Sequence, residues 1–330
     1  MSKYALHLSR QLFQDAIEHV PTRKGFGEGL LLAGQADRRV VALCADLTES
    51  TQMEAFAKQF PERFFEVGVA EQNLVTVASG LAATGKVPFT SSYAAFSPGR
   101  NWEQIRTTIC LNEQPVKVVG SHAGVSVGPD GATHQMLEDI ALMRSLPNMT
   151  VIVPADTHEA RKATQLLARS GQPAYLRLAR EKTAVVTTED SPFELCKAYV
   201  WREGKDVTLI VAGPLAYEAL KAAEKLAHDG IEATVINSPS VKPLDEATIL
   251  AAVQATGAVV TIEEAQIIGG LGGAIAELLG EKHPVPMARI GVRDAFGQSG
   301  TIAELWEHYQ LTAPHIMHAA KAVIKRKSGA

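Results

Sequence analysis

Residues 64–73 read Phe64-Phe65-Glu66-Val67-Gly68-Val69-Ala70-Glu71-Gln72-Asn73, and they join a short apolar segment to a run of small residues. This pattern predicts a helix over Leu74–Ala83 directly after the apolar segment, and we expect that helix to be buried on most sides. Glu71 then lies at the mouth of the helix. Desolvation there disfavours an ionised carboxylate and lets the group share a proton with a partner. A helix cap or dipole partner is the alternative interpretation of the same acid.

Outward from this stretch, short apolar runs alternate with helical segments along the whole chain. Runs without polar alternation are typical of parallel strands that are buried on both faces. The predicted strands are Val40–Cys44, Val116–Gly120, Thr150–Pro154, Pro173–Leu178, Val207–Val211, Ala233–Asn237 and Ala258–Ile262. The predicted helices include Ala160–Ala168 after a capping Asp156, Ala216–His228, Asp245–Ala255 and Ala274–Leu279.

This alternation predicts an α/β protein with two doubly wound domains, of which the first has a mostly parallel sheet and the second is smaller. Residues 181–200 interrupt the pattern. We therefore expect a first domain over residues 1–188, a linker over 189–200 and a second domain over 201–330.

The composition argues against several classes of function. The chain has 330 residues, a net charge of -4, 46% hydrophobic residues and 21% charged residues, so it lacks the basic surface of a nucleic-acid binder. Its three cysteines are widely spaced, which indicates buried thiols in a reducing compartment rather than disulfides or zinc. No apolar run approaches the roughly 20 residues of a membrane span, and Met1–Tyr4 shows no leader pattern. We expect a cytoplasmic location.

Four clusters of polar and aromatic residues lie in the first half, and three of them follow apparent strands. In an open α/β sheet the carboxyl ends of the strands are where ligands bind. Read singly, each cluster has a simpler interpretation as a cap, a turn or part of the core. The clusters are Thr22–Gly27, Ala45–Ser50, Pro88–Phe96 and Gly120–Gln135.

Taken together, these clusters indicate polar chemistry. Histidines such as His122 and His134 donate hydrogen bonds and exchange protons near neutral pH. Arg23 and Arg180 can each bind a phosphate with two parallel, charge-assisted hydrogen bonds. The combination suits a phosphorylated polyol or sugar. A glycine cluster at Gly269–Gly273 lacks the spacing of a dinucleotide fingerprint, and we interpret it as close helix–strand packing or an interface.

The order of these motifs resembles the C-terminal part of transketolases over essentially all 330 residues. The resemblance extends through the stretch that contains Glu71, the Ser92–Phe96 segment, the loop from Ser121 to Gln135 and the segment Leu137–Arg144. It implies a pyrimidine-binding domain followed by a transketolase C-terminal domain.

The family's Gly-Asp-Gly motif, which holds magnesium against thiamine diphosphate, does not occur here. The resemblance therefore implies a split transketolase. An N-terminal partner subunit would hold the diphosphate with Mg²⁺ or Ca²⁺, in an α2β2 heterotetramer. The reaction it implies is transfer of a two-carbon ketol unit from a ketose or ketose phosphate to an aldose or aldose phosphate, with no metal ligand in this chain.

The resemblance also assigns roles to individual residues. Glu71 matches the glutamate that hydrogen-bonds the aminopyrimidine ring and assists removal of the thiazolium proton. The cofactor-binding set that it implies is Glu71, Phe89, Tyr93, Phe96 and Asp46, where Phe89 and Tyr93 match the aromatics that pack on the ring, Phe96 supports them and Asp46 matches a nearby acid.

For the sugar phosphate, the resemblance implies a substrate-binding set in which Asp130 reads a hydroxyl and His134 lies near the reacting centre. His122 and His134 join Glu71 as the implied catalytic residues. The set is Arg23, Ser50, His122, Asp130, His134 and Arg180. The chain departs from the family pattern at Trp102-Glu103 and at Ser97–Arg100.

Three alternatives remain at this point. A 1-deoxyxylulose-5-phosphate synthase normally has Tyr-Pro-Arg-Gly where this chain has Leu178–Glu181, and it is normally a single chain. The beta subunits of 2-oxoacid dehydrogenases share this length and architecture but lack the Asp130–His134 pattern. A non-catalytic thiamine-binding subunit would have no need for the set Glu71, His122, Asp130 and His134.

Overall fold

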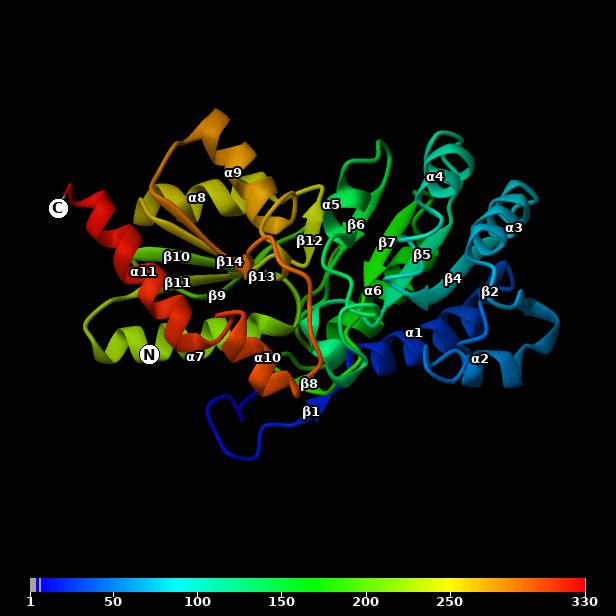
Figure 1. Ribbon diagram of the computed structural model, residues 1–330, viewed down its shortest axis with the longest axis horizontal. Helices are drawn as coiled ribbons and strands as arrows, with labels where there is room; N and C mark the ends of the chain where they lie inside the picture. The colour runs from blue at the N-terminus through cyan, green and yellow to red at the C-terminus, as the bar shows by residue number, and fades with distance from the viewer. Residues whose placement is uncertain (1–3, 6, 330) are drawn as a thin grey trace.

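In the computed structural model, which describes residues 4, 5 and 7–329, the chain forms a seven-stranded sheet, a five-stranded sheet and a two-stranded ribbon (Figure 1). The residues Met1–Lys3, on which part of the leader prediction rests, lie outside the described residues. The seven-stranded sheet has the order β12 (Ser240–Lys242), β6 (Thr150–Ile152), β7 (Ala174–Arg177), β5 (Lys117–Ser121), β4 (Val87–Tyr93), β2 (Val40–Cys44) and β3 (Phe64–Glu66). Neighbouring strands in it are parallel except for β12 against β6.

The second sheet has the order β14 (Met287–Val292), β13 (Val259–Gln266), β10 (Val207–Val211), β11 (Ala233–Asn237) and β9 (Tyr199–Arg202). Its strands are parallel except for β9, which pairs with β11 in the antiparallel direction. The short ribbon pairs β1 (His19–Val20) with β8 (Thr183–Ala184). The prediction of two α/β domains with mostly parallel sheets is confirmed.

Helices cover both faces of each sheet, as the buried strands require. On the first sheet, one face carries α1 (Thr22–Ala36), α2 (Glu54–Gln59) and α6 (Thr157–Arg169), and the other carries α3 (Glu71–Ala83), α4 (Trp102–Gln104), the π-helix η2 (Ile105–Cys110) and α5 (Asp139–Arg144). On the second sheet, α7 (Ala216–His228) and α11 (Ala313–Lys327) lie on one face, and α8 (Glu246–Thr256) and α9 (Leu271–Lys282) lie on the other. The short helices are η1 (Pro61–Arg63), η3 (Val125–Asp130), η4 (Gly213–Leu215) and α10 (Ile302–His308).

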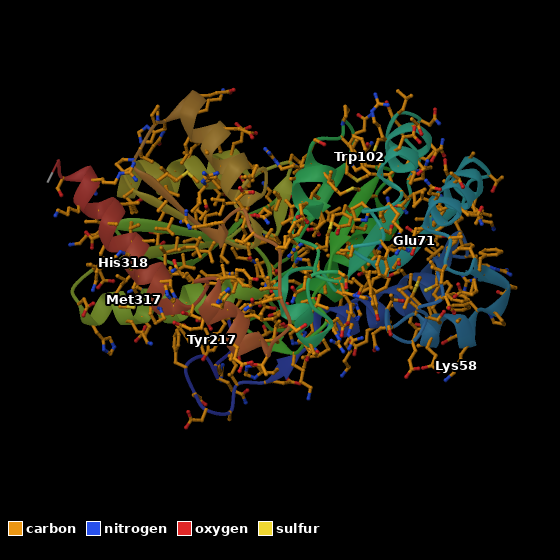
Figure 2. The ribbon with its side chains drawn as sticks, in the orientation of Figure 1. Lys58, Glu71, Trp102, Tyr217, Met317 and His318 are labelled. Atoms are coloured by element: carbon orange, nitrogen blue, oxygen red, sulfur yellow. The ribbon has the colours of Figure 1, made fainter. Side chains whose placement is uncertain are left out.

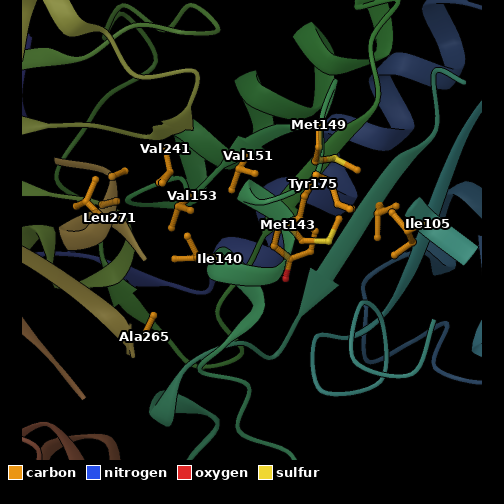
Figure 3. Packing of buried hydrophobic residues seen from close by; sticks show 14 of the residues in the cluster. Ile105, Ile140, Met143, Met149, Val151, Val153, Tyr175, Val241, Ala265 and Leu271 are labelled. Atoms are coloured by element: carbon orange, nitrogen blue, oxygen red, sulfur yellow. The ribbon is translucent and has the colours of Figure 1, made fainter. Parts of the chain in front are cut away.

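One buried apolar cluster runs from the first domain into the second (Figure 3). It includes Ile105 and Met143 beside the first sheet and Leu271 beside the second, with Val151 and Val241 between them. Strand β12, which is contributed by the second half of the chain, completes the edge of the first sheet. Leu8 and Ile17 pack into the core of the second domain. Because of these crossings the two domains share buried surface, and the boundaries at 188 and 201 stay predictions.

Helix α3 differs from the sequence expectation in its burial. Leu74, Val75 and Ala78 are fully buried, but Val77 and Gly80 are exposed on the opposite side. The expectation that this helix is buried on most sides is therefore wrong for the chain alone. The small residues on every side of α3 are typical of a helix that is fully covered. Full coverage of α3 requires another surface against its exposed outer face. Among the described residues, no helix is both long and apolar enough to span a bilayer.

Gly120 sits where β5 passes against a buried tyrosine. A Cβ added there would lie 2.1 Å from Tyr175 Oη, which donates a 2.7 Å hydrogen bond to Asp139 Oδ2. We expect Gly120→Ala to lower the free energy of unfolding by roughly 1–3 kcal/mol, because the tyrosine must move in a packed core. Urea unfolding of the purified chain measures this. Gly80→Ala is the matched control, since a Cβ there meets nothing within 4 Å, and equal midpoints for the two variants would contradict the packing argument.

Candidate functional site

The carboxyl ends of the parallel strands bring most of the predicted residues to one edge of the first sheet. Glu71 follows β3, Tyr93 ends β4, His122 follows β5 and Arg180 follows β7. Glu71 and Trp102 lie on the same side of the first domain (Figure 2). The site therefore has the location that the sequence predicted.

Glu71 is the first residue of α3 and its side chain is 4% exposed. Arg100 Nη1 lies 3.2 Å from each of its carboxylate oxygens, and the guanidinium of Arg100 stands 4.2 Å above the ring of Phe96. Asn101 Nδ2 donates to the backbone oxygen of Glu71 at 2.8 Å and to Ser97 Oγ at 3.1 Å. The carboxylate thus faces a flat N–H donor that is stacked on an aromatic ring.

Four rings form a cluster next to this pair. Tyr93 and His122 stack with centroids 3.8 Å apart, and Tyr93 stacks on Phe96 at 5.8 Å. His134 meets Phe96 edge-on at 5.4 Å and Tyr93 at 6.1 Å. The structure therefore brings together two of the three predicted aromatics, Tyr93 and Phe96, and both predicted histidines.

His122 is buried, and its surroundings oppose a positive charge. Burial, followed by the positive charges of Arg23 and Arg180 and by His134, lowers the pKa of His122 to about 3. This lowered pKa favours a neutral ring and opposes the expected proton exchange near pH 7, and a proton-transfer role for His122 stays a prediction. A neutral imidazole still offers one N–H donor. Ser121 Oγ lies 2.9 Å from Nδ1 of this ring.

The predicted phosphate ligands form a second group that is connected by hydrogen bonds. Arg23 donates to the backbone oxygens of Ser50, at 2.7 Å, and of Arg180, at 3.0 Å. Arg180 Nη1 donates to Val127 O at 2.7 Å and to Asp130 Oδ1 at 3.3 Å. Ser50 contributes its carbonyl here, whereas Asp130 pairs with Arg180 through its carboxylate. Two guanidinium groups thus lie close together beside His122.

Phe89 does not belong to this site. It is fully buried in β4 and packs against Phe26 with centroids 6.4 Å apart, so it has no surface with which to bind a cofactor. Phe89 and Tyr93 share a face of the strand but lie four residues apart, which separates them by about 13 Å. Within the Pro88–Phe96 cluster, Pro88–Tyr93 belongs to β4, and Ala94–Phe96 follow the end of the strand. The predicted role of Phe89 is wrong.

Asp46 lies at the end of β2 in the left-handed region, with φ 61°. Its backbone N–H donates to Glu66 Oε1 at 2.6 Å, and Glu66 also accepts from Thr48 and Gly68. Glu66 therefore joins the exits of β2 and β3. Its role was not predicted, although it is part of the stretch that introduces Glu71. The side chain of Asp46 is exposed, and its role as a cofactor ligand stays a prediction.

The glycine cluster at Gly269–Gly273 confirms the packing interpretation. Glu263 accepts hydrogen bonds from the backbone N–H groups of Leu271, at 2.7 Å, and Gly272, at 2.8 Å. A Cβ at Gly270 would lie 2.0 Å from Glu263 Oε2. The amino end of α9 is thus filled by a side chain of the protein itself. In the described part of the chain no group of three or more His, Cys, Asp or Glu side chains is arranged to hold a metal ion.

The fold and site define a two-domain α/β protein with a buried glutamate, an aromatic cluster and an arginine pair at one sheet edge. The family model of the transketolase pyrimidine binding domain matches residues 18–185, and that of the transketolase C-terminal domain matches residues 196–316. The chain belongs to the transketolase family.

Similar proteins cover nearly the whole chain. A 6-deoxy-6-sulfo-D-fructose transketolase subunit of Clostridium sp. (strain MSTE9) is 45% identical over 96% of this chain and 99% of its own length. One subunit of the apulose-4-phosphate transketolase of Phocaeicola vulgatus is 36% identical over 93% of this chain and 98% of its own length. A solved split gene transketolase, described as an inactive β4 tetramer, superposes with a TM-score of 0.88 at 44% identity and covers 93% of this chain and 99% of its own.

Proposed function

We propose that this chain is the C-terminal subunit of a split transketolase that transfers a two-carbon ketol unit with thiamine diphosphate. The observation that carries the proposal is the placement of buried Glu71 beside Phe96 and Tyr93, at the same sheet edge as His122, Arg23 and Arg180. One half of this site suits a planar cofactor ring and the other half suits an anionic sugar.

The residues around Glu71 fit an aminopyrimidine ring. Arg100 is itself a planar N–H donor that lies on Phe96 and binds the carboxylate, so the same position accepts another flat donor of hydrogen bonds. Thiamine diphosphate, when bound, supplies an acidic thiazolium carbon and an electron sink for cleaving the bond next to a ketose carbonyl. Glu71 would hold and return the proton of the ring nitrogen, and Phe96 and Tyr93 would orient the ring.

The substrate half suits an anion at the end of a polyol. Arg23 and Arg180 would bind the anionic group, His122 would donate a hydrogen bond as a neutral imidazole, and Asp130 would accept one from a sugar hydroxyl. One relative is named for a sulfo sugar and another for a sugar phosphate. Both kinds of substrate present an anion to the protein, which is the feature that the two arginines recognise.

In this proposal, a partner subunit supplies the diphosphate site. An N-terminal subunit would hold the diphosphate with Mg²⁺ or Ca²⁺ and complete an α2β2 heterotetramer. The solved relative described as an inactive β4 tetramer supports this, because it is a split gene transketolase that lacks activity in that form.

Replacement of Arg180 by alanine should separate phosphorylated donors from donors that carry no phosphate. Loss of a charge-assisted hydrogen bond costs roughly 1.5–3 kcal/mol, so we expect KM for a ketose phosphate to rise about 10- to 100-fold. KM for hydroxypyruvate, which has no phosphate, should change by less than threefold. The variant keeps the Arg180 carbonyl that binds Arg23. Steady-state kinetics of the assembled enzyme measure both values.

The control for this variant is Lys182→Ala, which removes an exposed cation two residues further along the chain. It should leave both constants unchanged. An equal rise of KM for the ketose phosphate and for hydroxypyruvate in Arg180→Ala would show that Arg180 is not a phosphate ligand.

A further inference from the structure

The second domain holds the loop between His122 and His134 through a buried carboxylate. Glu264 lies on β13 and is 1% exposed. Its Oε1 accepts a 2.5 Å hydrogen bond from the backbone N–H of Ser126, and its Oε2 accepts a 3.1 Å bond from Ser126 Oγ. The indole of Trp306, on α10, donates to Oε1 at 3.2 Å. A carboxylate of one domain is thus bound by the backbone of a loop in the other.

The backbone of the loop is shaped to admit this carboxylate. Gly124 has a φ of 84°, and a Cβ added there would lie 2.7 Å from Glu264 Cδ. A side chain at this position would meet both a strained backbone and the carboxylate. Gly124 lies midway between His122 and Ser126, so the contact acts directly on the segment that carries the buried histidine.

Two further contacts join the loop to the second domain near Asp130. Gln135 Nε2 donates to the loop oxygens of Val125, at 3.0 Å, and Gly128, at 3.3 Å, and also to Gln298 O at 2.9 Å. A Cβ at Gly131 would lie 2.7 Å from Ser299 Oγ. The loop is therefore fastened on both sides of the residues that face the substrate.

The two adjacent glutamates of β13 have different partners. Glu263 binds the amino end of α9, which is a contact within the second domain. The side chain of Glu264 contacts the loop and Trp306, and its backbone oxygen accepts from Arg177 at 2.9 Å. Burying a carboxylate costs free energy unless the carboxylate accepts strong hydrogen bonds. Hydrogen bonds from N–H groups to a carboxylate are charge-assisted and therefore strong. Glu264 thus stabilises the loop position, whereas Glu263 stabilises a helix.

We propose that Glu264 is a positioning residue of the active site. Through Ser126 it fixes the path of residues 121–135, and so it places His122 and Asp130 to bind the anionic sugar. The second domain, which contributes no predicted substrate ligand, takes part in substrate binding by this route. The kinetic part of this inference rests on the proposed function, and the structural part does not.

Amide hydrogen exchange of the isolated chain tests the structural part. In Glu264→Gln, peptides within residues 121–135 should exchange at least tenfold faster than in the unchanged chain, because an amide binds the Ser126 N–H less strongly than a carboxylate does. Glu263→Gln is the matched control: it should accelerate exchange in α9 and leave the loop unchanged. Unchanged loop exchange in Glu264→Gln, or equal acceleration of the loop in both variants, would overturn the proposal.

Kinetics of the assembled enzyme test the positioning role. We expect Glu264→Gln to raise KM for a ketose phosphate about tenfold while thiamine diphosphate affinity, measured by Trp fluorescence, changes less than threefold. Glu263→Gln should leave KM within twofold of the value for the unchanged enzyme, even where it lowers Tm as much as Glu264→Gln does. Equal changes of KM in the two variants would overturn the role. If the unchanged enzyme shows no ketol transfer while loop exchange responds as expected, the proposed function fails and the structural inference stands.

Gly124→Ala tests the same contact from the loop side if Glu264→Gln does not fold. The added Cβ pushes the loop from Glu264 without changing the second domain. We expect a similar rise in loop exchange and in KM. Where Glu264→Gln does fold, the effects of the two changes should not add in the double variant, because both remove one contact. Normal loop exchange in Gly124→Ala, or fully additive effects in the double variant, would overturn the proposal.

Discussion

Glu71→Gln should lower kcat of the assembled enzyme by about 10²–10⁴-fold, which is the usual contribution of a positioned acid–base group. Glutamine has nearly the same shape as glutamate, but it cannot take up or release a proton. The residue is buried and its only charged contact in the described residues is Arg100, so water cannot replace the carboxylate. Single-turnover and steady-state assays with a ketose donor measure the effect.

The variant needs a control for folding and for cofactor binding. Glu103→Gln makes the same change on an exposed residue of α4, whose carboxylate accepts only from Gln104, and it should retain the full rate. Circular dichroism should show the same fold for both variants, and thiamine diphosphate should still bind to the Glu71 variant. A kcat of Glu71→Gln within threefold of that of the unchanged enzyme would show that Glu71 takes no part in the chemistry.

The sequence was sufficient to predict most of the central strands, because they are buried on both faces, but the central strand β4 (Val87–Tyr93) was missed. Val40–Cys44 has the predicted bounds, since every residue of it is buried. The edge strands were missed for the opposite reason. Ser240–Lys242 is a short antiparallel strand that belongs to the sheet of the other domain. Because its pairing depends on tertiary contact, no pattern in the local sequence predicts it.

The sequence predicted the site residues that lie at the ends of strands. It missed those whose position depends on the local backbone conformation. Phe89 and Tyr93 looked equivalent by composition, yet the strand carries one into the core and the other to the edge. Arg100 appeared only as a departure from a family pattern, because the turn over Ser97–Asn101 places it on Glu71. The lowered pKa of His122 comes first from burial and then from Arg23 and Arg180, which lie far from it in the chain.

The outer face of α3 bears on the partner subunit. Val77 on this helix is exposed, as are Val69 just before it, at 69%, and Leu111 after the π-helix, at 74%. The Ser79 hydroxyl joins α3 to η2 by a 2.7 Å bond to Thr108 O, so the two elements form one continuous surface. Exposed apolar residues close to a functional site mark surfaces that bind another chain. In our proposal, this surface receives the partner beside Glu71.

The purified chain alone should show no ketol transfer, and it should become active when its N-terminal partner, thiamine diphosphate and Mg²⁺ are supplied together. In the proposed function Glu71 serves the pyrimidine end of the cofactor and the partner holds the metal of the diphosphate; the described residues of this chain contain no cluster of three or more metal-ligating side chains. Activity is measured with the chain alone, with the partner alone and with both, and each mixture is repeated with Glu71→Gln. The rate of ketol transfer by the mixture of unchanged subunits should exceed the rate of either subunit alone by at least 10³-fold, since rate enhancements by enzymes begin at roughly 10⁶.

The same assay locates the surface that the partner binds. Val77→Glu should prevent the gain in activity by placing a charge on the exposed face of α3, whereas Lys58→Glu, on the exposed side of α2 away from Glu71 (Figure 2), should not. Equal activity of the two variants with the partner would remove the outer face of α3 from the interface. Full activity of the chain without its partner would refute the split-subunit proposal, because a complete cofactor site would then lie within this chain or between its copies.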